Sequence, residues 1–238
     1  MTTQALHSDK FDWGLIKLVV FDVDGTLYAQ NRLRARMALD LAVHAALNRD
    51  LAVLKVIREY RRRREALGEQ DTPGFEAQLV RDTSLQIGCA ETFVLGVIHE
   101  WIETRPLKYL RALRYPHVAD LFEALRSSGR KIGVFSDYPA RSKLAALGLD
   151  ADFISSASDE DVGFLKPNPR GLEVILRAAD VRPGEAVLIG DRIERDGLAA
   201  RRAGTHALIR SSKAIREWRT FPGYDSAIFA PVLAPRLR

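Results

Sequence analysis

An apolar segment that ends in two carboxylates constrains this chain more than any other feature. The run from Leu18 to Phe21 is entirely apolar, and it is followed at once by Asp22, Asp24, Gly25 and Thr26. A short apolar run bounded by turn residues predicts a buried β-strand. In parallel α/β sheets, ligands gather at the carboxyl ends of the strands. The segment therefore predicts a buried strand with a reactive site at its end, where Asp22 falls.

The two carboxylates are suited to a division of labour. One can act in its ionised form as nucleophile and metal ligand, while the other, protonated part of the time, acts as a general acid. A carboxylate suits attack on phosphorus when a metal ion neutralises the oxygens around the reacting atom. Two acids at the end of a hydrophobic strand also repel each other unless a cation is near. Asp22 and Asp24 therefore indicate phosphoryl transfer.

The segment from Asp22 to Thr26 resembles the first signature of the haloacid dehalogenase (HAD) superfamily, whose members are mostly magnesium-dependent phosphatases that act through an aspartyl-phosphate. Three later segments resemble its other motifs, in the order that the family requires. They are Val134 to Asp137, Leu165 to Pro169, and Ala186 to Asp191 with Asp196 a little beyond. The resemblance covers the chain from about Ile16 to about Leu208, apart from an insertion. One departure is Asp137, because the family often carries asparagine there.

The resemblance implies a role for each matched residue. Asp22 is expected to be the nucleophile, and Asp24 the acid that protonates the leaving group and then the base that activates water. Mg²⁺ is expected between Asp22, the backbone carbonyl of Asp24, and Asp191. Asp196 is expected to orient Lys166 or a metal-bound water. The expected phosphate-binding residues are Ser136, Asp137, Lys166 and Thr26, with Thr26 also supporting the Asp24 loop.

The hydrophobic pattern changes its period twice along the chain. Between Tyr28 and Tyr115 no segment has a strand pattern, and apolar residues recur at helical spacing. From Pro116 onward short apolar runs alternate with amphipathic helices, the last clear strand being Thr205 to Ile209, and this alternation predicts a parallel sheet flanked by helices. We therefore predict a HAD-like α/β Rossmannoid core of residues 1–27 and 116–238. Residues 28–115 are predicted to form an α-helical cap domain, at the insertion point that the family uses.

Composition and charge limit the partners and the compartment. The chain has 238 residues, 47% of them hydrophobic, which is enough for a substantial core. Its single cysteine, Cys89, suits a reducing cytoplasm. The segment from Met1 to Trp13 is polar and no stretch approaches membrane-spanning length, so we expect a cytoplasmic protein with no membrane partner.

The net charge of +5 is consistent with an anionic partner. The densest basic run, from Arg61 to Arg64, is flanked by Glu59 and Glu65, so we interpret it as a solvated helix face. Substrate steering and nucleic-acid contact are the alternatives for this run, and nucleic acid is the less favoured partner. The expected partner is a small phosphorylated metabolite.

The preferred function is a magnesium-dependent phosphatase that hydrolyses a small phosphate monoester. A haloacid dehalogenase displaces halide, which needs no proton, so the placed acid Asp24 argues for phosphate esters. A sugar phosphomutase shares all four motifs and stays open as an alternative. A non-catalytic basic binding or scaffold protein on the same fold predicts decay of the catalytic positions, and none is lost here. The sequence does not specify the substrate.

Overall fold

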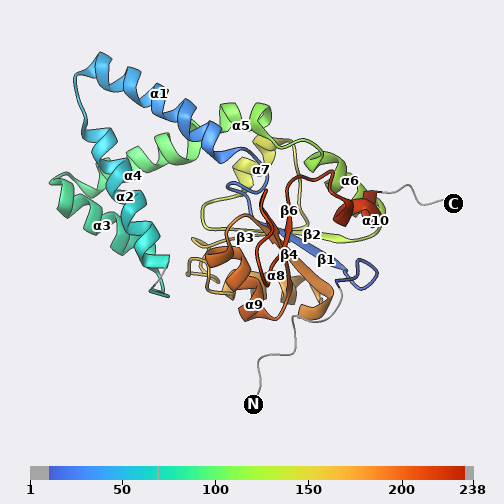
Figure 1. Cartoon of the computed structure of the whole chain (residues 1–238). Coiled ribbons are helices and arrows are strands. Elements are labelled where there is room, and N and C mark those ends of the chain that lie inside the picture. The colour runs from blue at the N-terminus through green and yellow to red at the C-terminus, as the bar shows by residue number, and fades with distance from the viewer. Residues whose placement is uncertain (1–10, 69, 234–238) are drawn as a thin grey trace.

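The computed structural model describes residues 11–68 and 70–233, and its core is one six-stranded sheet (Figure 1). Its strands are β1 (Leu18–Phe21), β2 (Lys131–Ser136), β3 (Phe153–Ser156), β4 (Ala186–Gly190), β5 (His206–Arg210) and β6 (Arg219–Phe221). All neighbours pair in parallel, in the order β3-β2-β1-β4-β5-β6. In register, Leu18 lies opposite Lys131 on one side and Ala186 on the other, so β1 is central.

Helices cover both faces of this sheet. Because side chains alternate along a strand, Val19 and Phe21 face one core and Leu18 and Val20 face the other. The first core is shared with α6 (Val118–Ser127) and α7 (Arg141–Leu147), and the second with α8 (Arg170–Ala179) and α9 (Leu198–Ala203). Strands buried on both faces read as continuous apolar runs, as β1 does. The prediction of an α/β core with a parallel sheet flanked by helices is confirmed.

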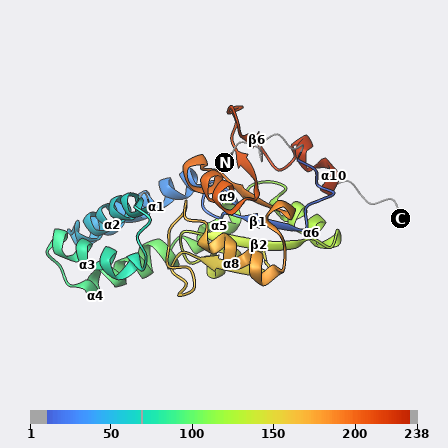
Figure 2. The same ribbon diagram turned by 90° about the horizontal axis from the view of Figure 1, so that it is seen from below.

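Between β1 and β2 the chain is mainly helical. The elements are α1 (Gln30–Asn48), α2 (Ala52–Gly68), α3 (Phe75–Ile87), α4 (Glu91–Ile98), a π-helical segment (His99–Thr104) and α5 (Leu107–Leu113). In both views, α1 to α4 stand as a group beside the α/β core (Figure 1 and Figure 2). Within this helical segment, the side chains of Phe75, Leu79 and Trp101 are buried. The Ala29 N–H donates to the Leu113 carbonyl at 3.0 Å, so the segment leaves and rejoins the core at neighbouring points.

The structure adds one strand that the sequence pattern did not predict. The expected last strand corresponds to β5, but Arg219–Phe221 pairs with it as β6. A three-residue strand is too short to show a period of its own. The aromatic side chains Phe221, Tyr224 and Phe229 are buried in the core, and the Tyr224 hydroxyl donates to the Thr26 carbonyl at 2.8 Å. The remaining short elements are Pro183–Glu185, Ile193–Gly197, Ala227–Phe229 and α10 (Ala230–Leu233).

No helix within residues 11–68 and 70–233 combines the length and the apolar character needed to cross a membrane. The first ten residues of the polar segment Met1 to Trp13, and with them the start of the predicted core domain at residue 1, lie outside the described residues. The same holds for the end of that domain, residues 234–238.

Candidate active site

Three parallel strands bring polar residues to one edge of the sheet. Asp22 follows β1, Ser136 is the last residue of β2, and Asp191 follows β4. The Asp22 N–H donates to the Ile189 carbonyl at 2.9 Å, which extends the pairing of β1 and β4 by one residue. The carboxyl ends of parallel strands meet at the same edge, and β1 is the point where the strand order changes direction. The end of β1 thus lies at the topological switch point of the sheet.

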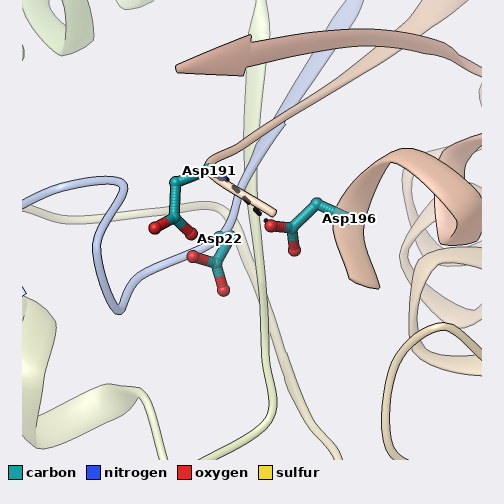
Figure 3. Close-up of side chains that lie close together, drawn as sticks. All are labelled: Asp22, Asp191 and Asp196. Carbon is teal, nitrogen blue, oxygen red and sulfur yellow. Dashed lines mark hydrogen bonds between the residues drawn. The ribbon is translucent and has the colours of Figure 1, made fainter. Parts of the chain in front are cut away.

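Three carboxylates lie side by side at this edge (Figure 3). Asp22, Asp191 and Asp196 each offer an oxygen within 4.8 Å of the others. The buried Oδ1 of Asp191 has no hydrogen-bond partner among the described residues. Gly25 has a φ of +94° and lies against the Asp191 side chain. A Cβ at this position would be only 2.2 Å from the Asp191 Oδ2. Glycine therefore lets the β1 loop reach the acidic cluster.

Asp196 differs from its two neighbours because both of its oxygens have partners. Its Oδ1 accepts from the Lys166 ammonium at 2.7 Å. Its Oδ2 accepts the backbone N–H groups of Asp191 at 3.1 Å and Arg192 at 3.0 Å. Asp196 therefore ties Lys166 to the loop after β4, whereas the partnerless oxygen of Asp191 remains able to coordinate a cation.

The electrostatics of the cluster favour a bound cation. Burial raises the pKa of Asp22 well above its ordinary value; Lys166 opposes that rise, and Asp196 and Asp191 add to it. Burial, together with Asp196, raises the pKa of Asp191 to about 7. Crowded carboxylates resist ionisation unless positive charge compensates them. Carboxylate oxygens are the ligands that Mg²⁺ prefers, so the donor set fits that ion.

Lys166 lies at the centre of the charged groups. Its ammonium is 2.5 Å from the Asp22 Oδ1 and 2.7 Å from the Asp196 Oδ1, and the side chain is buried. Burial alone lowers the pKa of Lys166, but Asp196 and Asp22 outweigh it, so that the pKa is raised well above the ordinary value. The lysine therefore carries a positive charge directly beside the predicted nucleophile.

Asp24 has a partner that sequence reasoning missed. The ammonium of Lys143, on α7, contacts its two carboxylate oxygens at 2.7 and 2.6 Å, and the Tyr28 hydroxyl donates to Oδ1. Burial raises the pKa of Asp24, but Lys143 more than offsets it, and the net pKa is lowered. The sequence predicts an Asp24 that is protonated part of the time. In the structure, its contact with Lys143 favours the ionised form instead. No sequence signal marked Lys143, since a lysine within a short helix resembles any surface lysine.

The other predicted phosphate ligands lie close to the site. Thr26 is fully buried, and its hydroxyl donates to the Asp22 Oδ2 at 2.8 Å. The Ser136 hydroxyl oxygen accepts the Tyr138 N–H at 3.2 Å. The Asp137 Oδ1 accepts the Lys166 backbone N–H at 2.8 Å. Asp137 and Thr26 thus hold Lys166 and Asp22 in place.

The basic run on α2 is not a uniformly solvated face, contrary to the interpretation from sequence. Arg64 is 4% exposed, and its guanidinium lies 4.2 Å from the centre of the Tyr138 ring and donates to the Asp137 carbonyl. Arg62 and Arg63 pair with Glu59 on the same helix. The run divides because consecutive residues on a helix point in different directions, about 100° apart.

A second link between α2 and the core runs through Arg195. This buried arginine donates to the Lys166 carbonyl and, at 2.8 Å, to the Glu65 carbonyl. The Glu65 carboxylate pairs with Arg195 at 3.1 Å and also with Arg192. The helical segment is therefore joined to the loops that carry Lys166 and Asp191.

A cavity of about 180 Å³ joins these groups. Its core side is lined by Asp22, Asp24, Asp137, Lys166, Asp191 and Asp196. Its other side is lined by residues of α1, α2 and α5, among them Leu33, Met37 and Leu110. Such a volume is smaller than the sites that hold drug-sized ligands, so it suits a small metabolite.

Comparison with known proteins shows which family this chain belongs to. The family model described as haloacid dehalogenase-like hydrolase matches residues 16–204. The chain belongs to this family. A glyceraldehyde 3-phosphate phosphatase of Methanopyrus kandleri is 32% identical over 198 residues, covering 80% of this chain and 82% of that protein. A glyceraldehyde 3-phosphate phosphatase of Methanothermobacter thermautotrophicus is 26% identical over 205 residues, covering 84% of this chain and 87% of that protein.

A solved structure supports the fold of this haloacid dehalogenase-like hydrolase. The 2-haloacid dehalogenase of Pseudomonas syringae superposes with a TM-score of 0.65 and 23% identity, covering 92% of this chain and 98% of that chain. At that identity the likeness concerns the fold alone, because one fold hosts different reactions.

Proposed function

We propose that this hydrolase is a magnesium-dependent phosphatase that hydrolyses a small phosphate monoester through an aspartyl-phosphate on Asp22. The observation that carries the proposal is the placing of Asp22 at the end of the central strand, 2.5 Å from the Lys166 ammonium and beside Asp191. The two relatives named as glyceraldehyde 3-phosphate phosphatases support a small phosphate ester as the substrate.

In the proposed first step, an Asp22 carboxylate oxygen forms a bond to phosphorus as the bond to the leaving alkoxide breaks in line. Lys166 offsets the negative charge of the phosphoryl oxygens, with Ser136 as a further donor. Thr26 holds the other Asp22 oxygen, which fixes the direction of attack. Asp137 and Asp196 hold Lys166 in position.

Asp24 moves protons in both steps of the proposed reaction. It gives a proton to the leaving oxygen, and then takes one from the water that attacks the aspartyl-phosphate. In this structure Lys143 holds Asp24 ionised, which suits the second step. For the first step Asp24 must carry a proton, so its contact with Lys143 has to loosen when the leaving group arrives.

Asp22, the Asp24 backbone carbonyl and Asp191 are the proposed ligands of Mg²⁺. When bound, the ion would neutralise the phosphoryl oxygens and the crowded carboxylates. The partnerless Asp191 oxygen and its raised pKa support this assignment.

We also propose that residues 28–115 act as a cap domain over a core of residues 1–27 and 116–238. The contacts of Arg64 and Glu65 with the core loops support the role of a cap, because they place the helical segment against the core at the cavity. A cap here would exclude stray water and select the leaving group. The single cysteine, Cys89, supports action in the cytoplasm.

The direct test is phosphate release from an aryl phosphate with and without Mg²⁺, comparing the natural protein with Asp22→Asn. We expect activity that needs Mg²⁺ and falls at least about a thousandfold in the variant. Asp22→Glu serves as a second variant, which keeps the negative charge but moves the carboxylate oxygens by the length of one methylene group. Activity that persists in Asp22→Asn would contradict the proposal, and transfer of phosphate between positions of a sugar without its release would favour the phosphomutase.

A further inference from the structure

Five arginines line the active-site cavity, and they fall into two groups. Arg64, Arg192 and Arg195 are each held by protein partners, as described above. Arg34 and Arg61 also line the cavity, but neither forms a hydrogen bond, ion pair or ring contact within residues 11–68 and 70–233. Their electrostatic interactions are with two tyrosines, Arg34 with Tyr28 and Arg61 with Tyr138. Neither guanidinium group therefore has a carboxylate partner in the part of the chain that the structure describes.

The two arginines are placed on helix faces that point at the cavity. On α1 the lining residues are Gln30, Leu33, Arg34 and Met37. On α2 they are Arg61, Arg64 and Glu65. Spacings of three and four residues mark one face of a helix, so each arginine belongs to the face that its helix presents to the site. Both are exposed as well, which places them where the cavity opens to solvent.

The carboxylates on the core side do not need these two cations. Asp22 and Asp196 pair with Lys166, and Asp24 pairs with Lys143. Glu65 pairs with Arg192 and Arg195. Asp191, whose Oδ1 lacks a partner, lies in the acidic cluster that fits Mg²⁺. Asp137, the remaining carboxylate on the core side, accepts the Lys166 backbone N–H at 2.8 Å and forms no ion pair with Arg34 or Arg61 among the described residues. The positive charge of Arg34 and Arg61 is thus available to a ligand.

We propose that the substrate carries a second anionic group, a carboxylate or a second phosphate, at the end remote from the scissile phosphate, and that Arg34 and Arg61 bind it. This inference rests on the proposed phosphatase function and specifies its substrate class. Guanidinium groups bind carboxylate and phosphate oxygens through paired, charge-assisted hydrogen bonds. Leu33, Met37 and Leu110 supply an apolar wall that suits the carbon skeleton between the two anionic groups.

The test compares three short esters that differ at the remote end. Glyceraldehyde 3-phosphate ends in a neutral aldehyde, 3-phosphoglycerate ends in a carboxylate, and the bisphosphate of glycerol ends in a second phosphate. Activity on 4-nitrophenyl phosphate, which has no second anion, tests the phosphatase function separately. We expect the natural protein to have a kcat/KM about tenfold to a hundredfold higher for an anionic ester than for the neutral one. Whichever of the two anionic esters is preferred identifies the second group.

The double variant Arg34→Ala/Arg61→Ala is expected to lose that preference mainly through KM, while its activity on 4-nitrophenyl phosphate stays within about threefold. Arg34→Lys/Arg61→Lys should restore part of it. Arg36→Ala and Arg58→Ala are matched controls, because both arginines are exposed on the same helices and neither lines the cavity. Equal efficiency on all three esters, or an equal loss on every substrate in the double variant, would overturn the inference. No activity on 4-nitrophenyl phosphate in the natural protein would instead count against the phosphatase function.

Discussion

Lys143 sets the charge of Asp24 through contacts with both of its carboxylate oxygens. Asp24 is buried, so a neighbouring cation has a large effect on its pKa. The proposed acid and base roles of Asp24 therefore depend on a residue of α7 that belongs to none of the recognised motifs. Tyr28 adds a hydrogen bond that keeps the carboxylate facing Lys143.

We predict that Lys143→Ala shifts the pH dependence of turnover. Lys143 lowers the pKa of Asp24, so its removal raises that pKa. Ionised Asp24 is needed to accept a proton from water, and the acid limb of the kcat profile should move to higher pH by about one unit. The measurement is kcat against pH at saturating Mg²⁺. Arg141→Ala, an exposed change on the same helix, is the control, and an unmoved acid limb in Lys143→Ala would contradict the role given to Asp24.

At the scale of elements, α2 joins the helical segment to the core. Gly68 lies so close to Arg195 that a Cβ there would be 1.6 Å from its Nη1. Glu65 contacts Arg192 and Arg195, which belong to the loop that also carries Asp191 and Asp196. The position of α2 is therefore coupled to the loop that shapes the acidic cluster.

Glu65→Gln is expected to weaken this junction. The hydrogen bond from Arg192 lowers the pKa of Glu65 to about 2, despite the opposing effect of burial. Because the pKa is lowered on folding, the stabilisation is present above the ordinary glutamate pKa and is lost as pH falls through about 2. The side chain is 53% exposed, so the loss at neutral pH should be only about 0.5 kcal/mol.

The measurement is the free energy of unfolding of both proteins at neutral and at acid pH, together with KM. We expect the stability difference to shrink in acid and KM to rise in the variant. Glu59→Gln is a matched control, because within residues 11–68 and 70–233 Glu59 pairs only with Arg62 and Arg63 of the same helix. A KM that rises equally in both variants would show that the junction has no special role.

The elements that the sequence predicted well are those with a long, regular pattern. The central strands were predicted within a residue or two because strands buried on both faces are apolar throughout. The three-residue β6 has no such pattern, so it was missed. Asp22, Lys166 and Asp191 could be predicted from their motifs, whereas the partner of Asp24 could not, since Lys143 meets Asp24 only when the chain folds and α7 lies next to the loop after β1. The differences in exposure and partners among Arg61 to Arg64 likewise depend on how α2 packs against the core.

At the scale of the whole molecule, the acidic cluster should make stability depend on a cation. Burial and Asp196 raise the pKa of Asp191 to about 7. A carboxyl whose pKa is raised on folding contributes stability below its ordinary pKa, and this contribution is lost as pH rises through about 7. A cation bound only to the folded state would offset that loss.

We predict that Mg²⁺ raises the melting temperature of the natural protein at neutral pH. The gain in the free energy of unfolding should be about 2.7 kcal/mol when free Mg²⁺ exceeds its Kd about a hundredfold. In Asp191→Asn, the loss of stability as pH rises through about 7 should become smaller when no metal is added, with the part due to Asp22 remaining, and the response to Mg²⁺ should weaken sharply. Thermal unfolding with and without the ion checks both expectations, and an identical Mg²⁺ response in the variant would remove Asp191 from the ligand set.

The most direct test of the proposed chemistry is to find the phosphoryl group on Asp22. The protein is mixed with substrate and Mg²⁺, quenched in acid within one turnover, and digested, and the peptide that carries Asp22 is weighed by mass spectrometry. We expect a transient mass gain of one phosphoryl group on that peptide, absent in Asp22→Asn and absent without substrate. Phosphate release at the full rate with no phosphorylated peptide at any time would contradict the role of Asp22 as the nucleophile.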